Sequence, residues 1–194
     1  MHATRPIVEE AVRYVIDSQS SEFMVQAFST GLFSAFAHNP KIAIRDFEGS
    51  LSFRRLGGTL EDARMEMRIR AGSLAVMGDM SEKDRKEITE RMHDEVLRSD
   101  AFPEIVYECL RVAASGNGNL FWAALSGSLT LRGVNRPQPI SAKLSLKEGS
   151  LRAAGEFSLR QSAYEIAPVT AVGGTIRLKD ELKFSFDIAA REQG

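Results

Sequence analysis

The side chains that could act in catalysis or bind a metal are few in this 194-residue chain, and they are scattered along it. Three histidines (His2, His38 and His93) and one cysteine, Cys109, have no spacing typical of a metal site. The sequence contains no Gly-x-Ser-x-Gly nucleophile elbow, and the Gly-x-Gly at residues 116–118 is too short to indicate a phosphate-binding loop. The sequence therefore predicts a protein that is not an enzyme and has no metal or cofactor.

His38 is the histidine best placed to contact a ligand, since it follows an apolar segment and precedes Asn39. Its position fits a polar group at the mouth of a cavity, and it equally fits the C-terminus of a helix, where the dipole favours a positive charge. We expect His93 to be solvated on a charged helix and Cys109 to be a small buried hydrophobic residue. Trp122 and its neighbour Phe121 point to opposite faces of a strand, and either of them lines the interior or packs under the helix.

Strict alternation of apolar and polar residues dominates the last third of the chain, from Leu125 to Arg191. Such alternation in neighbouring segments predicts antiparallel strands with one buried and one solvated face. Bare sheet edges would promote aggregation, and closing the sheet into a barrel removes them. We therefore predict a mainly β protein, an antiparallel up-and-down barrel of about eight strands with one longer and one short helix.

Alternation of apolar and polar residues in the first half of the chain predicts further strands. Val12–Ile16 alternates as a first strand, residues 19–21 form a turn, and a second strand starts at Phe23. The alternation changes parity near Arg45, which predicts a β-bulge there, because a one-residue slip would turn every later side chain to the wrong face.

Two helices complete the prediction. Ser29 or Thr30 can cap a short apolar helix that Pro40 ends, and such a helix would cover one end of the barrel. The longer helix spans Ser81–Ser99, and Ser81 followed by Asp84 approximates a capping box at its start.

The interior side chains decide whether such a barrel is solid or hollow. A barrel of about eight strands is either filled by side chains or holds one small ligand, and the alternation leaves both alternatives open. If it is hollow, the predicted lining consists of long flexible or bulky residues, namely Met65, Met67, Leu129, Leu131, Leu144, Phe157, Phe184 and Phe186.

Length and composition indicate one soluble domain spanning residues 1–194. A formal net charge of −1, from 25 basic and 26 acidic side chains, argues against a nucleic-acid-binding surface. The longest weakly polar run, Leu120–Leu131, is shorter than the roughly 20 apolar residues that a membrane-spanning helix needs. The N-terminus lacks a basic region followed by an apolar one, so we expect no secretory signal and a cytoplasmic location.

Five segments of the chain, in this order, resemble the YceI-like family. The most specific is GSLTLRGVNRPQPISAKL, in which a strand, a turn and a returning strand follow one another. Two residues, Ala163 and Glu165, depart from the family's common Asp and Gly at those positions. The segments are Tyr14–Phe28, Phe47–Phe53, Val96–Cys109, Gly127–Leu144 and Phe157–Ile166.

The resemblance implies a lipocalin-like barrel that binds a long-chain lipid. We expect non-catalytic binding of a polyisoprenoid, an isoprenoid quinone or a fatty-acid derivative in an apolar tunnel, with His38 as a candidate polar group at its mouth. One alternative is a filled barrel that serves as an interaction or stress-response module. Another is an enzyme that uses His38 as acid or base, which we rank last because the sequence supplies no paired catalytic groups. The family also raises the alternative of a homodimer through the barrel wall.

Overall fold

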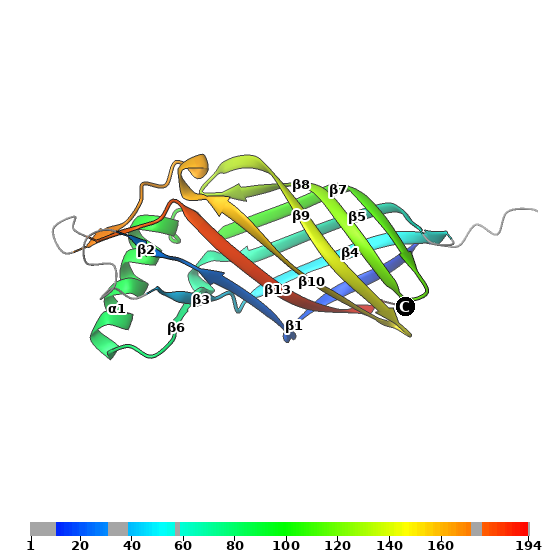
Figure 1. Cartoon of the computed structure of the whole chain (residues 1–194), viewed down its shortest axis with the longest axis horizontal. Coiled ribbons are helices and arrows are strands. Elements are labelled where there is room, and N and C mark those ends of the chain that lie inside the picture. The colour runs from blue at the N-terminus through cyan, green and yellow to red at the C-terminus, as the bar shows by residue number, and fades with distance from the viewer. Residues whose placement is uncertain (1–10, 31–38, 57–58, 172–175, 194) are drawn as a thin grey trace, which may run out of the picture.

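The computed structural model describes residues 11–30, 39–56, 59–171 and 176–193, which form a closed antiparallel β-barrel (Figure 1). Eight long strands make the wall, each paired with the next along the chain, and the last pairs with the first. The prediction of a mainly β, up-and-down barrel is therefore confirmed. The strands are β1 Val12–Gln26, β4 Phe47–Leu56, β5 Thr59–Arg70, β7 Glu104–Asn117, β8 Leu120–Leu131, β9 Val134–Lys147, β10 Ser150–Arg160 and β13 Glu181–Glu192.

The alternating sequence pattern produces the two faces of this wall. Along β5, Ala63, Met67 and Ile69 are buried, and the charged residues between them are exposed. Leu144 and Leu146 repeat the pattern on β9, between exposed lysines. Removing these apolar side chains from water stabilises the barrel by about 25 cal/mol for each Å² buried, so the pattern fixes which face of each strand points inward.

One helix covers an end of the barrel (Figure 1). It starts as α1 Glu82–Arg91, and the hydroxyl of Ser81 accepts the backbone N–H of Asp84 at 3.1 Å, which confirms the predicted N-terminal cap. The helix continues in π-type turns as η3 Met92–Leu97 and ends at Arg98, whose backbone is left-handed with φ 49°.

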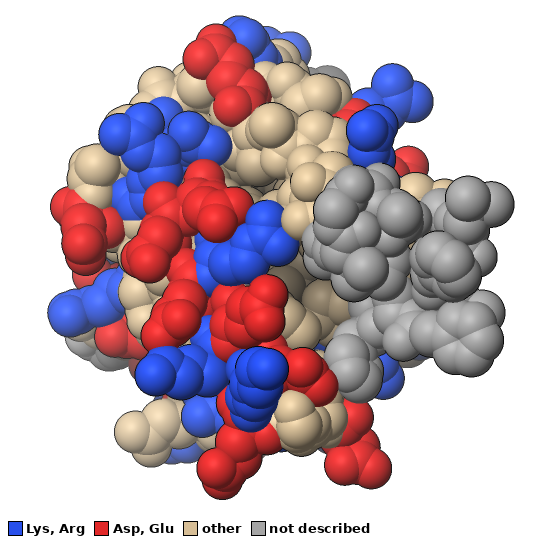
Figure 2. Space-filling model, turned by 90° about the vertical axis from the view of Figure 1, so that its left-hand side faces the viewer, with Lys and Arg blue, Asp and Glu red and all other residues tan. Residues whose placement is uncertain are grey.

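The buried face of this helix is narrow. Met92 and Leu97 are buried in the main core, and Ile88 and Val96 pack partly against it. The rest of the helix is charged, and Figure 2 shows acidic and basic side chains interspersed over this end of the molecule. The helix therefore caps the barrel with an apolar stripe and faces solvent with mixed charge.

Short elements surround the helix-covered end. The β1 strand extends the barrel sheet through β3, which pairs with β6, while β2, β11 and β12 form a small sheet of their own. Two 3-10 turns, η2 and η4, follow β5 and β10. Their bounds are β2 Ser29–Thr30, β3 Lys41–Ala43, η2 Ala71–Ser73, β6 Ala75–Met77, η4 Gln161–Tyr164, β11 Thr170–Ala171 and β12 Ile176–Leu178.

The turn expected at residues 19–21 is wrong, because β1 runs unbroken through it. The pairing register of β1 with β13 shifts between Asp17 and Glu22. The Asp17 carboxylate accepts the backbone N–H of Ser20 at 3.3 Å and its hydroxyl at 2.9 Å. Local polar hydrogen bonds thus hold an irregularity inside one long strand instead of reversing the chain.

The β-bulge expected near Arg45 is also wrong. Residues 44–46 separate two strands that pair with different parts of β1: β3 pairs with Met24–Gln26 and β4 with Val12–Val15. The alternation of apolar residues changes parity here because β3 and β4 pair with different segments of β1. Ser29 and Thr30, expected to cap a short helix, form β2, and the remainder of that expected helix, residues 31–38, lies outside the described residues.

Candidate functional site

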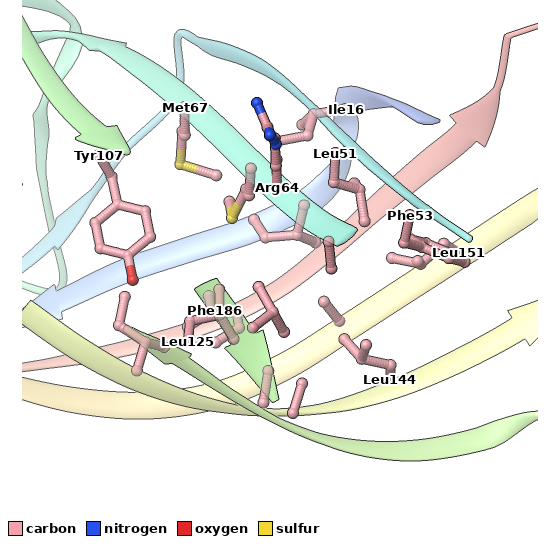
Figure 3. A pocket seen from close by; sticks show the side chains of 18 of the residues that line it. Ile16, Leu51, Phe53, Arg64, Met67, Tyr107, Leu125, Leu144, Leu151 and Phe186 are labelled. Atoms are coloured by element: carbon pink, nitrogen blue, oxygen red, sulfur yellow. The ribbon is translucent and has the colours of Figure 1, made fainter. Parts of the chain in front are cut away.

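An apolar cavity of about 120 Å³ lies inside the barrel (Figure 3). All eight barrel strands contribute to its wall, and Leu51, Leu125, Leu144 and Phe186 reach it from four of them. An engineered protein cavity of roughly 150 Å³ with a similar apolar lining stays dry and binds benzene. This cavity is therefore large enough for a small apolar group, and a long chain needs neighbouring side chains to move.

Six of the eight residues predicted to line the lumen contribute to the cavity wall. Leu131 does not, and is instead buried in the larger core cluster. Phe184 also lies off the cavity, in a separate groove that includes Lys183. His38 lies outside the described residues, so its role at a mouth stays a prediction. The six are Met65, Met67, Leu129, Leu144, Phe157 and Phe186, and their contact with a ligand also stays a prediction.

Several lining residues lie on β1 and β4, strands from which no lining residue was predicted. Ile16 and Phe23 lie on β1 and Leu51 on β4, and all three reach the cavity. Ile16 and Phe23 are seven residues apart in sequence, an odd spacing that would place them on opposite faces of a regular strand. The irregularity of β1 at residues 17–22 turns both side chains inward. Predicting this irregularity within one continuous strand requires the pairing register of β1 with β13.

Tyr107 and Gln138 bring polar groups to the cavity wall. The Tyr107 hydroxyl donates to the backbone carbonyl of Gln138 at 3.2 Å, and the Gln138 side-chain amide donates to the carbonyls of Pro139 and Ser158 at 3.2 and 3.3 Å. Burial raises the pKa of Tyr107, so its hydroxyl remains protonated. A Cβ at Gly127 would collide with the Tyr107 hydroxyl, so glycine is required beside this ring.

The hydrogen-bond ladder of the wall is interrupted between β5 and β7. Met65 pairs with Cys109, but residues 60–64 have no ladder partner on β7, and β7 itself slips against β8 before Val112. Arg64 lies at this interruption and contributes to the cavity wall, and its guanidinium points away from the interior in Figure 3. Sequence alternation missed Arg64 because its parity places it on the outer face.

Clusters of apolar side chains pack at both ends of the barrel interior. At the end away from the helix, the rings of Tyr14 and Phe53 stack with centroids 5.5 Å apart, and Phe121 is only 1% exposed. At the helix end, Met92 and Tyr164 are buried in the other cluster. The cavity thus lies between two packed layers of side chains.

The other residues considered from the sequence, His93, Cys109 and Trp122, do not line the cavity. His93 is not solvated as expected, because its Nε2 lies 3.1 Å from the carbonyl oxygen of Leu74 and its Nδ1 lies 3.4 Å from the hydroxyl of Ser99. Cys109 is fully buried, as predicted. Trp122 neither lines the interior nor packs under the helix, since it is 68% exposed on the outer face of β8.

Within the described residues, no group of three or more His, Cys, Asp or Glu side chains is arranged to hold a metal ion. In the same part of the chain, no helix has the length and apolar character needed to cross a membrane.

These features define a class of protein: a closed up-and-down barrel with an apolar cavity and a helix over one end. The model of the YceI-like domain matches residues 14–190, and the chain belongs to this family, which confirms the resemblance.

Solved structures with the same fold are distant in sequence. BcnA of Burkholderia cenocepacia is 14% identical with a TM-score of 0.67, over 90% of this chain and 98% of that one. A polyisoprenoid-binding domain of Saccharophagus degradans, implicated in plant cell wall breakdown, is 11% identical with a TM-score of 0.65, over 93% and 98%. The YceI protein of Campylobacter jejuni is 13% identical with a TM-score of 0.60, over 81% and 88%. No curated protein matches the chain.

Proposed function

We propose that this protein binds the apolar chain of a long-chain amphiphile inside its barrel without catalysing a reaction. The observation that carries the proposal is the apolar cavity inside the barrel, to which all eight strands contribute. Membership of the YceI-like family and the fold shared with a polyisoprenoid-binding domain support a binding role. A polyisoprenoid, an isoprenoid quinone and a fatty-acid derivative all have the chemistry that such a cavity accepts.

The size of the cavity requires the barrel to adapt when it takes up a long chain. Each buried methylene contributes about 0.8 kcal/mol, so a chain gains affinity only by displacing side chains that now occupy the lumen. Met65 and Met67 are suited to this role, because an unbranched thioether side chain has three rotatable bonds and repacks readily.

The first experiment asks whether the purified protein carries a lipid. Protein prepared without detergent is extracted with organic solvent, and the extract is weighed by mass spectrometry against a blank. We expect a long-chain species in stoichiometric amount. A clean extract, together with no uptake of added isoprenoid quinone or fatty acid, would favour the filled barrel that acts through its surface.

A matched pair of variants tests whether the cavity holds the ligand. Ala153 lines the cavity, and its neighbour Ala154 lies on the outer face of the same strand. Ala153→Leu should weaken the binding of cis-parinaric acid, a fluorescent fatty acid, by about tenfold, because the added side chain fills the lumen. Ala154→Leu should leave binding unchanged. Equal binding by the two variants would contradict the cavity as the binding site.

A further inference from the structure

The outer faces of β8 and β9 carry no carboxylate along their length, although the chain has 26 acidic residues. Their outward positions hold small, hydroxyl, apolar and lysine side chains and one amide, Asn135. Two cross-strand pairs are central, because Trp122 pairs with Lys143 and Ala124 with Ser141. We call Leu120, Trp122, Ala124, Pro139, Ser141 and Lys143 the β8–β9 face.

Two large apolar side chains of this face lie in solvent. Trp122 is 68% exposed and Leu120 51% exposed. The Lys143 ammonium lies 5.9 Å from the centre of the Trp122 ring. An exposed indole ring with a cation above it presents an apolar surface and a positive charge together. Residues of this kind are typical of surfaces that contact another molecule.

The last part of the neighbouring strand β7, residues 113–117, continues the uncharged surface. On β7, Ala113 pairs with Ala124 and Ser115 pairs with Trp122. Carboxylates border this face on three sides, at Glu108 on β7, which pairs with Ser128, at Glu148 in the turn after β9 and at Glu156 on β10. The β8–β9 face therefore differs from the helix-covered end, where charges of both signs alternate (Figure 2).

We propose that the β8–β9 face docks on an anionic phospholipid surface. Tryptophan prefers the boundary between headgroups and acyl chains, and each lysine near an anionic membrane adds about a fivefold gain in binding. The absence of carboxylates removes the repulsion that such a surface would otherwise meet. Because the net charge of the chain is −1, attraction to the membrane must be local to this face.

A second copy of the chain is the competing occupant. A two-fold contact would place this face against itself, so that Lys143 of each copy approaches the same face of the other, which contains no carboxylate to pair with it. The charge pattern therefore favours a lipid surface. Docking does not depend on the cavity proposal, because a barrel with a filled lumen would carry the same face.

Trp122 is the only tryptophan of the chain, so its fluorescence reports directly on this face. Adding vesicles of phosphatidylglycerol and phosphatidylcholine should shift its emission to shorter wavelength, and vesicles of phosphatidylcholine alone should not. High salt should reverse the shift, because it screens exposed charges beyond a few ångströms. An unchanged emission with the anionic vesicles would overturn the proposal.

Charge reversal gives the matched control. Lys143→Glu should lower co-sedimentation with the anionic vesicles by about tenfold. Lys183 on β13 has a similar place over an aromatic ring, with its ammonium 5.7 Å from the centre of Phe28, and Lys183→Glu should have little effect. Equal losses in the two variants would overturn the assignment to this face. An emission shift that follows protein concentration without vesicles would show a second copy instead and would also overturn it.

Discussion

Phe157 of β10 and Phe184 of β13 stack across the ladder, with ring centroids 4.6 Å apart and planes 9° from parallel, yet only Phe157 lines the cavity. Phe186, two residues further along β13, does line it. The boundary between the cavity wall and the packed aromatic layer therefore passes between Phe186 and Phe184, two inward-facing residues of β13.

Truncation of these two β13 residues should have different effects on binding. Phe184→Ala and Phe186→Ala should each lower the free energy of unfolding by about 2 kcal/mol, because both remove a half-buried ring. Only Phe186→Ala should enlarge the cavity and raise the affinity for cis-parinaric acid. Urea unfolding and fluorescence titration measure the two effects. Similar changes in binding for both variants would contradict this boundary.

Two buried tyrosines should respond oppositely to loss of their hydroxyl groups. Tyr107 donates a hydrogen bond to Gln138, whereas the hydroxyl of Tyr164 is buried with no partner in the described part of the chain. Tyr107→Phe should lower the free energy of unfolding by about 1 kcal/mol, since it removes this buried hydrogen bond. Tyr164→Phe should be neutral or stabilising, because it removes an unsatisfied polar group. Urea unfolding of both variants checks this, and a clear loss in Tyr164→Phe would reveal a partner.

Replacing Glu165 with glycine should stabilise the protein. Glu165 ends the η4 turn with a left-handed backbone, φ 59° and ψ 29°, a conformation that glycine adopts without strain. Glu165→Gly should raise the free energy of unfolding by about 0.5–1 kcal/mol, or the melting temperature by about 2–4 °C. Glu165→Ala is the control, because it removes the carboxylate and keeps the Cβ. A matching gain in the alanine variant would assign the effect to charge.

The sequence was informative wherever one face of a strand meets water. On β5 and β9, charged or hydroxyl residues alternate with apolar residues such as Met67 and Leu144. The strand and its inward face were therefore both predictable. The β1 strand was harder, because its irregularity depends on pairing with β13, which is distant in sequence.

Alternation cannot separate a cavity wall from a packed layer, because both need apolar side chains that point inward. Leu131 and Phe184 have the correct parity but lie off the cavity. Arg64 reaches the cavity wall from the outer face, through an interruption of the ladder that no local pattern marks. Phe121 and Trp122 were predicted to point to opposite faces, and two neighbouring aromatic residues give no local signal for which one points inward; the structure buries Phe121 and exposes Trp122.

The last prediction concerns acid stability at the helix-covered end. The Asp180 carboxylate accepts the backbone N–H of Ser162 at 2.7 Å and its hydroxyl at 2.6 Å, and so fastens η4 to the start of β13. These hydrogen bonds hold the pKa of Asp180 below its ordinary value of 3.8. A carboxyl group with a lowered pKa in the folded state contributes stability above its ordinary pKa, and that contribution is lost as the pH falls through the folded-state value.

Asp180→Asn should therefore be less stable than the parent near neutral pH, and the difference should shrink as the pH falls below about 4. Urea unfolding at a series of pH values measures this difference. Asp100→Asn is the control, since Asp100 is exposed in the turn after the helix and should change stability little at any pH. A difference between parent and Asp180→Asn that stays constant down to acid pH would mean that the hydrogen bonds to Ser162 do not depend on the charge of Asp180.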